Sequence, residues 1–249
     1  MVDIDLSGRF AAVTGGARGI GHAIVRALAE AGAAVAVLDK DADAAEETAS
    51  SLRRGGGDAR ALALDVTDRV QVDAVVDALW TQRPIDIWVN NAGVSSMGRL
   101  VDLTDEDWDF NMDVNAKDVF LCSRAVARKM LFRERGTIVN VASMAGLKVL
   151  PQIGVYCMSK AAVVHMTRAM ALEWGRFGIN VNAICPGYID TEMNHEHWDT
   201  EAGRKLMDML PRKRVGRAED LDPVLLMLAS GQSHFVNGAV ISADDGFGV

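Results

Sequence analysis

The residues best suited to chemistry are a tyrosine and a lysine four positions apart, Tyr156 and Lys160. On a helix this spacing places both side chains on one face. A phenol holds its proton at neutral pH, and a neighbouring ammonium stabilises the phenolate. Ser143 lies upstream, directly after an apolar run, and could hold a substrate oxygen against the phenol. The three residues predict acid–base catalysis at an oxygen atom; the alternative is an amphipathic helix whose lysine reaches solvent.

A glycine-rich turn lies near the start of the chain, Thr14–Gly21, with the spacing Gly-x-x-x-Gly-x-Gly. Glycines let the backbone approach a pyrophosphate without an intervening Cβ, and the N-terminus of the helix that follows supplies free N–H groups. The turn therefore predicts a dinucleotide-binding site; the alternative is an ordinary loop closure. Its candidate cofactor-binding residues are Gly15, Arg18, Gly19, Ile20 and Gly21.

Asp39 ends the second apolar run, about 20 positions after the glycine turn. A carboxylate at this place accepts hydrogen bonds from the adenosine ribose and repels a 2′-phosphate. Arg18 favours the opposite choice, because a guanidinium can bind a 2′-phosphate. We expect the fixed carboxylate to prevail, so NAD(H) is the predicted cofactor and NADP(H) is the alternative.

Short polar sequences close two further apolar runs. Asp65-Val66 follows the third run, where the carboxylate could accept a hydrogen bond from the adenine amino group. Asn90–Gly93 follows the fourth, and its short residues would let a cofactor pass close over the sheet. Both lie at the carboxyl ends of predicted strands, where open α/β sheets bind ligands. The candidate cofactor site therefore also includes Asp65, Val66, Asn91, Ala92 and Gly93.

Apolar runs alternate with amphipathic helical patterns along the whole chain. Most runs are continuous, which is typical of strands buried on both faces of a parallel sheet. The alternation predicts βαβ units and a doubly wound α/β fold, and no low-complexity linker divides it, so we expect one domain over residues 1–249. The expected strands are Phe10–Val13, Ala34–Leu38, Ala61–Leu64, Ile85–Val89, Thr137–Val141, Ile179–Ile184 and Ala239–Ser242. The expected helices are Gly19–Ala31, Ala42–Leu52, Val70–Leu79, Trp108–Met130, Val155–Trp174 and Asp220–Leu228.

The segment from Gly187 to about Gly216 breaks this alternation, and no strand is expected in it. Because it follows the carboxyl end of a strand, we expect a lid over the substrate. His195 and His197 could hydrogen-bond to substrate hydroxyls, and with no third ligand placed beside them we expect no metal site. Four apolar residues of the segment would instead suit an apolar substrate: Met193, Trp198, Met207 and Leu210.

Charge and composition exclude several function classes. The chain of 249 residues has 26 basic and 34 acidic residues, a formal net charge of −8, which disfavours nucleic-acid binding. No apolar run reaches the length of a membrane span, and the first residues carry no signal-peptide pattern, so we expect a cytoplasmic protein with no membrane association. Its three cysteines lie apart among apolar neighbours, which predicts reduced, buried thiols.

Together these motifs make the chain resemble the short-chain dehydrogenase/reductase family over essentially its whole length. The matching residues are Thr14–Gly21, Asp65-Val66, Asn90–Gly93, Asn115, Ser143, Tyr156, Lys160, Pro186-Gly187 and Thr191. The resemblance implies a single Rossmann-type domain with a seven-stranded parallel sheet in the order 3-2-1-4-5-6-7. It also implies a homotetramer in which the helices Trp108–Met130 and Val155–Trp174 of adjacent subunits pair.

The resemblance assigns roles to the site residues. Tyr156 would exchange a proton with the alcohol or ketone oxygen while Ser143 orients the substrate. Lys160 would stabilise the phenolate and bind the nicotinamide ribose, and Asn115 would anchor a water relay to Lys160. The remaining cofactor contacts would come from Pro186, Gly187, the backbone of Ile189 and Thr191, the last two holding the carboxamide.

Two departures from the family pattern stand out. The last strand usually ends in Asp-Gly-Gly, but here the sequence is Asp244-Asp245-Gly246-Phe247-Gly248. Reductases of the bacterial 3-oxoacyl-carrier-protein type place an arginine before the helix glutamate, whereas Leu172 precedes Glu173 here. The second departure weakens the prediction of a carrier protein as partner.

The leading functional hypothesis is hydride transfer between NAD(H) and a secondary alcohol/ketone pair, with a 3-oxoacyl thioester or a similar ketone as substrate. The alternative within the same class is a polyol or sugar dehydrogenase. A hypothesis from a different class is a catalytically silent dinucleotide sensor, which the intact Ser143, Tyr156 and Lys160 disfavour.

Overall fold

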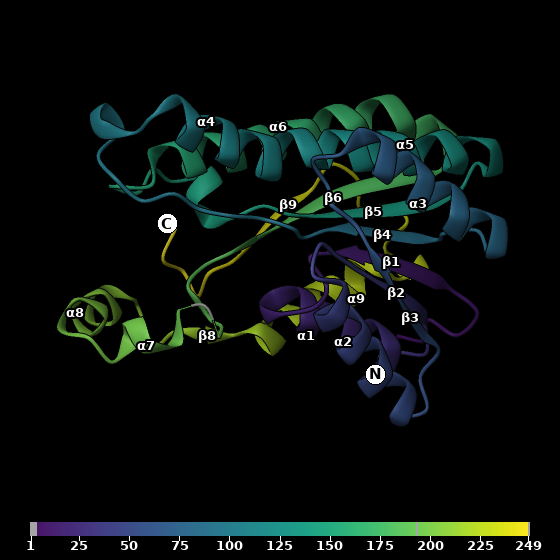
Figure 1. Ribbon diagram of the computed structural model, residues 1–249, viewed down its shortest axis with the longest axis horizontal. Coiled ribbons are helices and arrows are strands. Elements are labelled where there is room, and N and C mark those ends of the chain that lie inside the picture. Colours follow the sequence, from purple (N-terminus) through teal and green to yellow (C-terminus); the bar gives the residue numbers. More distant parts are fainter. Residues whose placement is uncertain (1–3, 193, 249) are drawn as a thin grey trace.

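A parallel sheet of seven strands forms the centre of the molecule (Figure 1). The computed structural model describes residues 4–192 and 194–248. The strand order is β3-β2-β1-β4-β5-β6-β9, and every neighbouring pair is parallel. Because β9 is the seventh strand of the sheet along the chain, this order confirms the predicted 3-2-1-4-5-6-7. The strands are β1 (Phe10–Thr14), β2 (Ala34–Asp39), β3 (Ala59–Ala63), β4 (Ile87–Asn90), β5 (Gly136–Val141), β6 (Ile179–Pro186) and β9 (Val240–Ala243).

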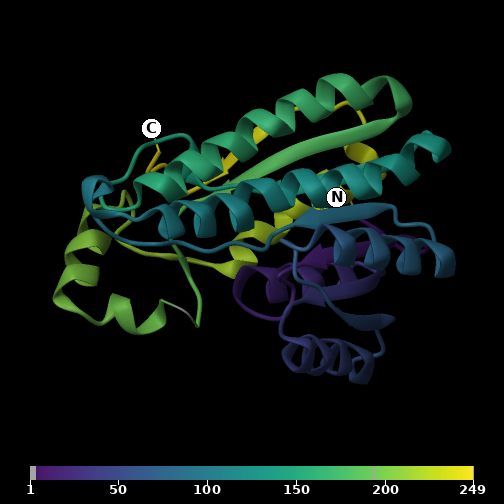
Figure 2. The same ribbon diagram turned by 45° about the horizontal axis from the view of Figure 1, so that its top comes forward.

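Helices cover both faces of the sheet. One face carries α1 (Gly19–Glu30), α2 (Ala42–Arg54) and α9 (Asp222–Ala229) (Figure 1). The other face carries α3 (Arg69–Gln82), α5 (Asp118–Arg133) and α6 (Gly154–Trp174), and the last two lie side by side in both views (Figure 2). The doubly wound α/β fold predicted from the alternation is therefore confirmed.

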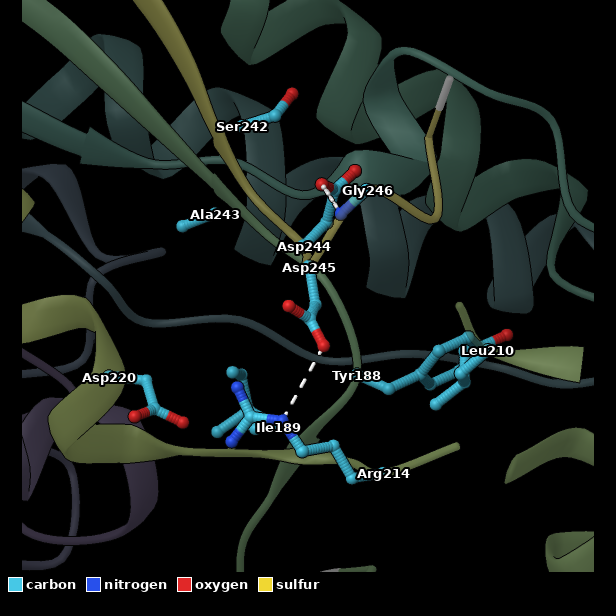
Figure 3. A pocket seen from close by; sticks show the side chains of 11 residues that line it. Tyr188, Ile189, Leu210, Arg214, Asp220, Ser242, Ala243, Asp244, Asp245 and Gly246 are labelled. Carbon is cyan, nitrogen blue, oxygen red and sulfur yellow. Dashed lines mark hydrogen bonds and ion pairs between the residues drawn. The ribbon is translucent and has the colours of Figure 1, made fainter. Parts of the chain in front are cut away.

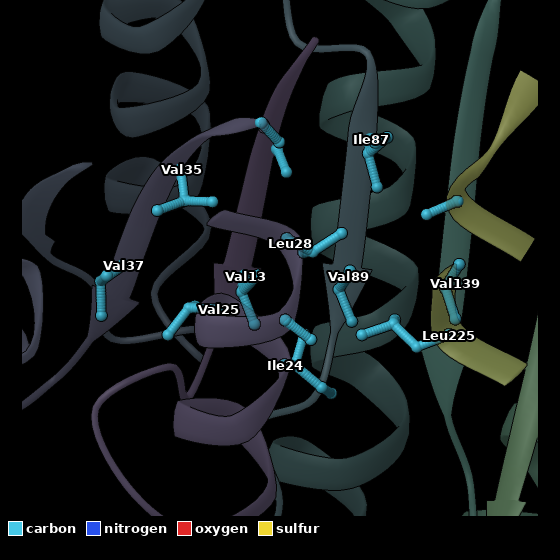
Figure 4. Packing of buried hydrophobic residues seen from close by; sticks show 14 of the residues in the cluster. Val13, Ile24, Val25, Leu28, Val35, Val37, Ile87, Val89, Val139 and Leu225 are labelled. Carbon is cyan, nitrogen blue, oxygen red and sulfur yellow. The ribbon is translucent and has the colours of Figure 1, made fainter. Parts of the chain in front are cut away.

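Each face of the sheet has its own apolar core, which explains why the strands are continuous apolar runs. On one face, Val13 and Val89 pack against Ile24 of α1 and Leu225 of α9 (Figure 4). On the other face, the fully buried Trp88 lies in a second cluster with side chains from α3 and α5. Since successive side chains of a strand point to opposite faces, a strand covered on both sides has no polar positions to alternate with.

The predicted helix Trp108–Met130 is interrupted, and this expectation was wrong in detail. The chain forms α4 (Asp105–Met112), then a π-helical turn (Asp113–Lys117), and then α5. The apolar periodicity does not mark the turn, because the wider turn is held by tertiary hydrogen bonds from Asn115 to the loop after β4. Single π turns are frequent at functional sites.

The segment 187–216 contains the short helices α7 (His195–Trp198) and α8 (Glu201–Met209), which lie beyond the carboxyl edge of the sheet (Figure 1). We call it the insertion. The expectation of no strand was wrong at its ends, because β7 (Ile189–Asp190) pairs in parallel with β8 (Gly216–Arg217). Two-residue strands are too short to produce an apolar pattern, so only their meeting in space reveals them. Met193 lies outside the described residues.

The cysteines agree with the expectation of reduced, buried thiols. Cys122, Cys157 and Cys185 are free and buried, and burial raises the pKa of Cys185 to about 11. None of the helices within residues 4–192 and 194–248 has the length and apolar content needed to cross a membrane.

Candidate active site

Tyr156 and Lys160 lie in the first two turns of α6, as their spacing predicts. The Lys160 side chain is buried, with 4% of its surface exposed, and its Nζ donates to the carbonyl oxygen of Val141 at 3.0 Å. The same Nζ lies 5.8 Å from the centre of the Tyr156 ring. A buried ammonium held in one place acts on its neighbours through a low dielectric, so its influence on the phenol is stronger than in water.

Ser143 follows β5 and faces the same region. Its Oγ accepts a hydrogen bond from the N–H of Ala145 at 3.0 Å. The next turn packs directly on α6, since a Cβ added at Gly146 would lie 2.7 Å from the Lys160 carbonyl group. Glycine at this position therefore lets the turn that follows Ser143 pack directly against the helix of Tyr156 and Lys160.

Asn115 lies in the π turn, and its side chain is fully bonded. Its Nδ2 donates to the Val94 carbonyl oxygen at 2.8 Å and to Ser159 Oγ at 3.0 Å, while its Oδ1 accepts from the Val94 N–H at 2.8 Å. A Cβ at Gly93 would lie 3.3 Å from Asn115 Oδ1 and 3.4 Å from Lys160 Nζ. The structure thus brings Asn115, Gly93 and Lys160 together at the end of β4.

A buried carboxyl group, that of Asp118, lies near this cluster. Asp118 is fully buried at the start of α5, and its Oδ2 has no hydrogen-bond partner among the described residues. Burial raises the pKa of Asp118 well above its ordinary value, although the charge of Lys160 opposes the shift. Burial therefore makes the charged form of Asp118 costly at this place.

The glycine turn makes a close backbone cradle at the amino end of α1. Gly15 and Gly19 have φ values of +61° and +53°, a region that favours glycine. A Cβ at Gly15 would lie 2.9 Å from Ala92 Cα, and one at Gly21 would lie 1.9 Å from the Gly15 carbonyl oxygen. Arg18, the residue before the helix, makes no side-chain cap, which leaves the first N–H groups of α1 available to a phosphate.

Hydrogen bonds join this cradle to the end of β4. Thr14 Oγ1 accepts from the N–H groups of Asn91 at 3.0 Å and Ala92 at 3.2 Å. Asn91 Nδ2 in turn donates to the carbonyl oxygens of Thr14 and Gly15. The sheet order reverses between β1 and β4, so this is the switch point at which a dinucleotide crosses such a sheet.

Asp39, expected to favour NAD(H), and Arg18, expected to favour NADP(H), have different partners in the structure. Asp39 faces the cradle, where its Oδ2 accepts from the Ala17 N–H at 3.2 Å and its Oδ1 accepts from the Asp41 N–H at 3.1 Å. Arg18 instead forms an ion pair with Asp41, with Nη2 2.6 Å from Oδ2. The carboxylate is thus fixed and the guanidinium already has an anionic partner.

Asp65 and Val66 lie just beyond β3, as predicted. Asp65 Oδ1 accepts hydrogen bonds from the Thr67 hydroxyl at 2.7 Å and the Thr67 N–H at 2.9 Å. The hydroxyl bond, followed by the backbone bond, lowers the pKa of Asp65 below its usual value. Val66 is buried, with 8% of its surface exposed, and fixes the start of this turn.

The end of β6 brings the last group of predicted residues to the cradle. Pro186 closes the strand, and Gly187 donates its N–H to the Ala243 carbonyl oxygen at 3.0 Å. Two residues later Ile189 begins β7. A Cβ at Gly19 would lie 3.6 Å from Thr191 Cγ2, so the glycine turn and the start of the insertion lie side by side.

Comparisons with known proteins agree over the full length of the chain. A family model described as enoyl-(acyl carrier protein) reductase matches residues 15–248. Galactitol 2-dehydrogenase from Rhizobium johnstonii is 44% identical over 252 residues, which cover 97% of this chain and 96% of that protein. The structure of a short-chain type dehydrogenase/reductase from Mycobacterium marinum is 39% identical and has a TM-score of 0.92, covering 98% of this chain and 97% of the other. The chain belongs to the short-chain dehydrogenase/reductase family.

A third relative bears on the cofactor of this short-chain dehydrogenase/reductase. The structure of a gluconate 5-dehydrogenase from Burkholderia cenocepacia, in complex with NADP and tartrate, is 37% identical with a TM-score of 0.94 and covers 98% of this chain and 97% of the other. The protein is an oxidoreductase that acts on CH–OH groups with a nicotinamide dinucleotide. The glycine cradle, the uncapped start of α1 and the carboxylate of Asp39 fit such a group.

Sequence reasoning missed one residue that organises the cofactor side of this dehydrogenase/reductase. Asn194 Oδ1 accepts from both the N–H of Thr191 at 2.8 Å and its hydroxyl at 3.2 Å. Asn194 Nδ2 donates to the carbonyl oxygen of Ile189 at 2.9 Å. The Asn194 side chain therefore fixes both Ile189 and Thr191, the two residues expected to hold the carboxamide. The available signal was an asparagine three residues after a threonine, a spacing that favours local side-chain to backbone bonds.

The histidines of the insertion do not form a metal cluster in the part of the chain that the structure describes. His195 Nδ1 lies 3.0 and 3.1 Å from the two carboxylate oxygens of Asp190, and this hydrogen bond raises the pKa of His195. The ring of His197 contacts Trp198, with 5.2 Å between ring centres. His195 is thus held as a partner of Asp190.

A cavity of about 460 Å³ lies beside β7, between the insertion and the end of β9 (Figure 3). The Arg214–Asp245 ion pair borders it, with Nε 3.5 Å from Oδ2. The catalytic candidates Ser143, Tyr156 and Lys160 are not among its lining residues. The lining residues are Tyr188, Ile189, Leu210, Arg214, Gly216, Asp220 and 242–246.

Proposed function

We propose that this protein is an NAD-dependent dehydrogenase that oxidises one secondary hydroxyl of a polyol or a sugar-derived alcohol to a ketone. The observation that carries the substrate class is the 44% identity to galactitol 2-dehydrogenase along nearly the whole chain. The gluconate 5-dehydrogenase supports this substrate class, because gluconate and the tartrate bound in its structure both carry more than one hydroxyl group. We also propose that residues 1–249 act as one catalytic domain.

The proposed mechanism assigns one task to each polar side chain. Tyr156 takes the hydroxyl proton during oxidation and returns it during reduction, while the Ser143 hydroxyl bonds to the same substrate oxygen. Lys160 stabilises the phenolate by its charge, and Asn115 holds the first turns of α6 in place through its bond to Ser159. When bound, the nicotinamide ring accepts or supplies the hydride.

The remaining residues would hold the cofactor. The cradle of Gly15, Gly19 and Gly21 would receive the pyrophosphate at the start of α1. Asp39 would accept the ribose hydroxyls, and Thr191 would hold the carboxamide after being oriented by Asn194. Asp39 supports NAD(H), because a fixed carboxylate and a 2′-phosphate repel each other.

The sequence around Leu172 favours the polyol proposal over a carrier-bound 3-oxoacyl thioester. Of the apolar residues expected to line an acyl pocket, Trp198 is buried with 7% of its surface exposed, whereas Leu210 lines the cavity beside β7. Leu172, at the place of the expected carrier-binding arginine, is 85% exposed and offers no charge to an acidic carrier protein. We propose that the insertion acts as the lid over the polyol.

The test is a substrate panel with purified protein and both cofactors. We expect NAD⁺-dependent oxidation of four- to six-carbon polyols at a kcat/KM at least tenfold above that for reduction of 3-oxoacyl thioesters. The measurement is NADH absorbance over time. Preference for the thioester would contradict the substrate class, and dinucleotide binding with no turnover of any alcohol or ketone would support the silent sensor instead.

We further propose a homotetramer. Most apolar side chains of the two long helices are covered within the single chain and are not available to a partner subunit: Val119, Leu121, Val126, Val163 and Val164 are buried, and Met166 is half-buried. The apolar surface left on the outer face of the helical layer instead comes from Trp108, Phe110, Phe120 and Met158, each 40–48% exposed. Exposed large apolar side chains on neighbouring helices support an interface between subunits.

Light scattering coupled to size exclusion should give the mass of four 26.8-kDa chains. Phe120→Ser, which puts a polar group on this face, should lower the mass to that of smaller species. A wild-type mass equal to one chain would rule out the tetramer.

A further inference from the structure

The segment after β9, Asp244–Gly248, folds back on itself and is here called the tail. Asp245 and Gly246 have φ values of +56° and +83°, which reverse the chain direction. The Asp244 side chain fixes the turn, since its Oδ1 accepts from the Gly246 N–H at 3.1 Å and its Oδ2 accepts from the Gly248 N–H at 2.9 Å. The tail is therefore an ordered element with bonds of its own.

The turn brings the ring of Phe247 to the catalytic side of the molecule. Phe247 packs against a buried cluster around Cys157, and Tyr156 packs against the same cluster. Lys148 Nζ lies 4.8 Å from the centre of the Phe247 ring and donates to the Phe247 carbonyl oxygen at 3.0 Å. The Phe247 and Tyr188 ring centres are 5.6 Å apart. Phe247 is thus held on three sides.

The other side of the tail is tied to the insertion. Asp245 pairs with Arg214, with 3.5 Å between Nε and the carboxylate (Figure 3). It also pairs with Arg212, whose Nε lies 3.2 Å from the other carboxylate oxygen. At the base of the tail, a Cβ on Gly187 would lie 2.7 Å from Asp244 Cα, so the tail packs directly on the end of β6. The tail therefore lies between the charged cavity on one side and the cluster that contains Tyr156 on the other.

We propose that Phe247 is a specificity-determining residue whose ring forms the far wall of the substrate site and limits the length of the carbon chain that reaches Tyr156. This inference rests on the acid–base role of Tyr156 in the proposed function. Asp245 is a positioning residue, since it holds the wall in place through Arg212 and Arg214 without touching the substrate.

The physical reason is the volume and rigidity of the ring. An aromatic ring in contact with Tyr188 and beneath the Lys148 ammonium has little freedom to move aside. A substrate longer than the space before it must displace the ring, whereas a short one need not touch it. A difference of one methylene group in an apolar pocket changes kcat/KM by about 10- to 200-fold.

The test compares Phe247→Ala and Phe247→Trp with wild type. Substrates are secondary alcohols from 2-propanol to 2-octanol and polyols of four to six carbons, and the readout is the ratio of kcat/KM for the longest and shortest member of each series. We expect Phe247→Ala to raise this ratio about tenfold or more and Phe247→Trp to lower it. The dissociation constant of NADH, measured by fluorescence, should stay within about twofold, because Phe247 is not among the candidate cofactor-binding residues.

Two further variants separate the wall from general effects. Phe132→Ala removes a phenylalanine that is 91% exposed at the far end of α5, and it should leave the ratio unchanged. Asp245→Asn should raise the ratio less than Phe247→Ala does, because it weakens the ion pairs that hold the tail but keeps the Phe247 ring. If Phe247→Ala does not fold, Phe247→Leu provides the same comparison with a smaller change.

A kcat/KM ratio within twofold of wild type in both Phe247→Ala and Phe247→Trp would show that Phe247 does not limit the length of the substrate. That failure is distinct from failure of the proposed function. If the polyols are not oxidised but the ratio for the 2-alkanols changes as expected, the proposed substrate class is wrong and Phe247 still limits chain length. If polyols are oxidised and neither ratio changes, the substrate class stands and Phe247 does not limit chain length.

Discussion

Replacing Tyr156 with Phe should reduce kcat by about 10²- to 10⁴-fold, the usual contribution of a positioned acid–base group. The substitution removes only the phenolic oxygen and leaves the ring that packs in α6. Because Lys160 keeps its bond to the Val141 carbonyl oxygen, the cofactor side of the site should be preserved. Steady-state kcat and NADH affinity, measured on the same preparation, check both halves of this expectation.

The chain contains a matched control for this experiment. Tyr188 is the only other tyrosine, and Tyr188→Phe removes a phenolic oxygen while keeping the ring contact to Phe247. Its kcat should change by far less than that of Tyr156→Phe. More than a tenth of wild-type kcat remaining in Tyr156→Phe would exclude this tyrosine as the proton carrier.

Replacing Asp39 with Ser should shift cofactor preference toward NADP(H) by at least tenfold in the ratio of kcat/KM values. The carboxylate is fixed by two backbone N–H groups, so it cannot turn away from a 2′-phosphate. A charge–charge contribution at a partly buried site is worth a few kcal/mol, and each factor of ten needs about 1.4 kcal/mol. The measurement is kcat/KM for both cofactors with one substrate.

The ion pair between Arg18 and Asp41 refines this experiment. Arg18 is the cation expected to receive a 2′-phosphate, but Asp41 already binds it at 2.6 Å. The NADP(H)/NAD(H) ratio of kcat/KM should therefore rise much less in Asp39→Ser combined with Arg18→Ala than in Asp39→Ser alone. It should rise more in Asp39→Ser combined with Asp41→Asn, because the Arg18 guanidinium then loses its anionic partner. A wild type that already prefers NADP(H) would show that Arg18 outweighs Asp39.

The sequence alone determined the fold and the two local motifs of this protein. Strands buried on both faces leave continuous apolar runs, and the helices between them keep their own periodicity, so the doubly wound sheet can be read along the chain. Tyr156 and Lys160 are one helical turn apart, and the glycines of Thr14–Gly21 are close neighbours. Each of these signals lies within a few residues, where spacing alone fixes geometry.

Tertiary structure decided what depends on residues far apart in the chain. The π turn at Asn115 is stabilised by bonds to Val94, which no helical periodicity records. Asp41 binds Arg18, and this pairing forms only because β2 ends beside the glycine turn. Phe247 reaches the cluster of Tyr156 because two left-handed residues reverse the tail after β9. Such contacts depend on how distant segments pack, and packing is a property of the folded chain rather than of local spacing.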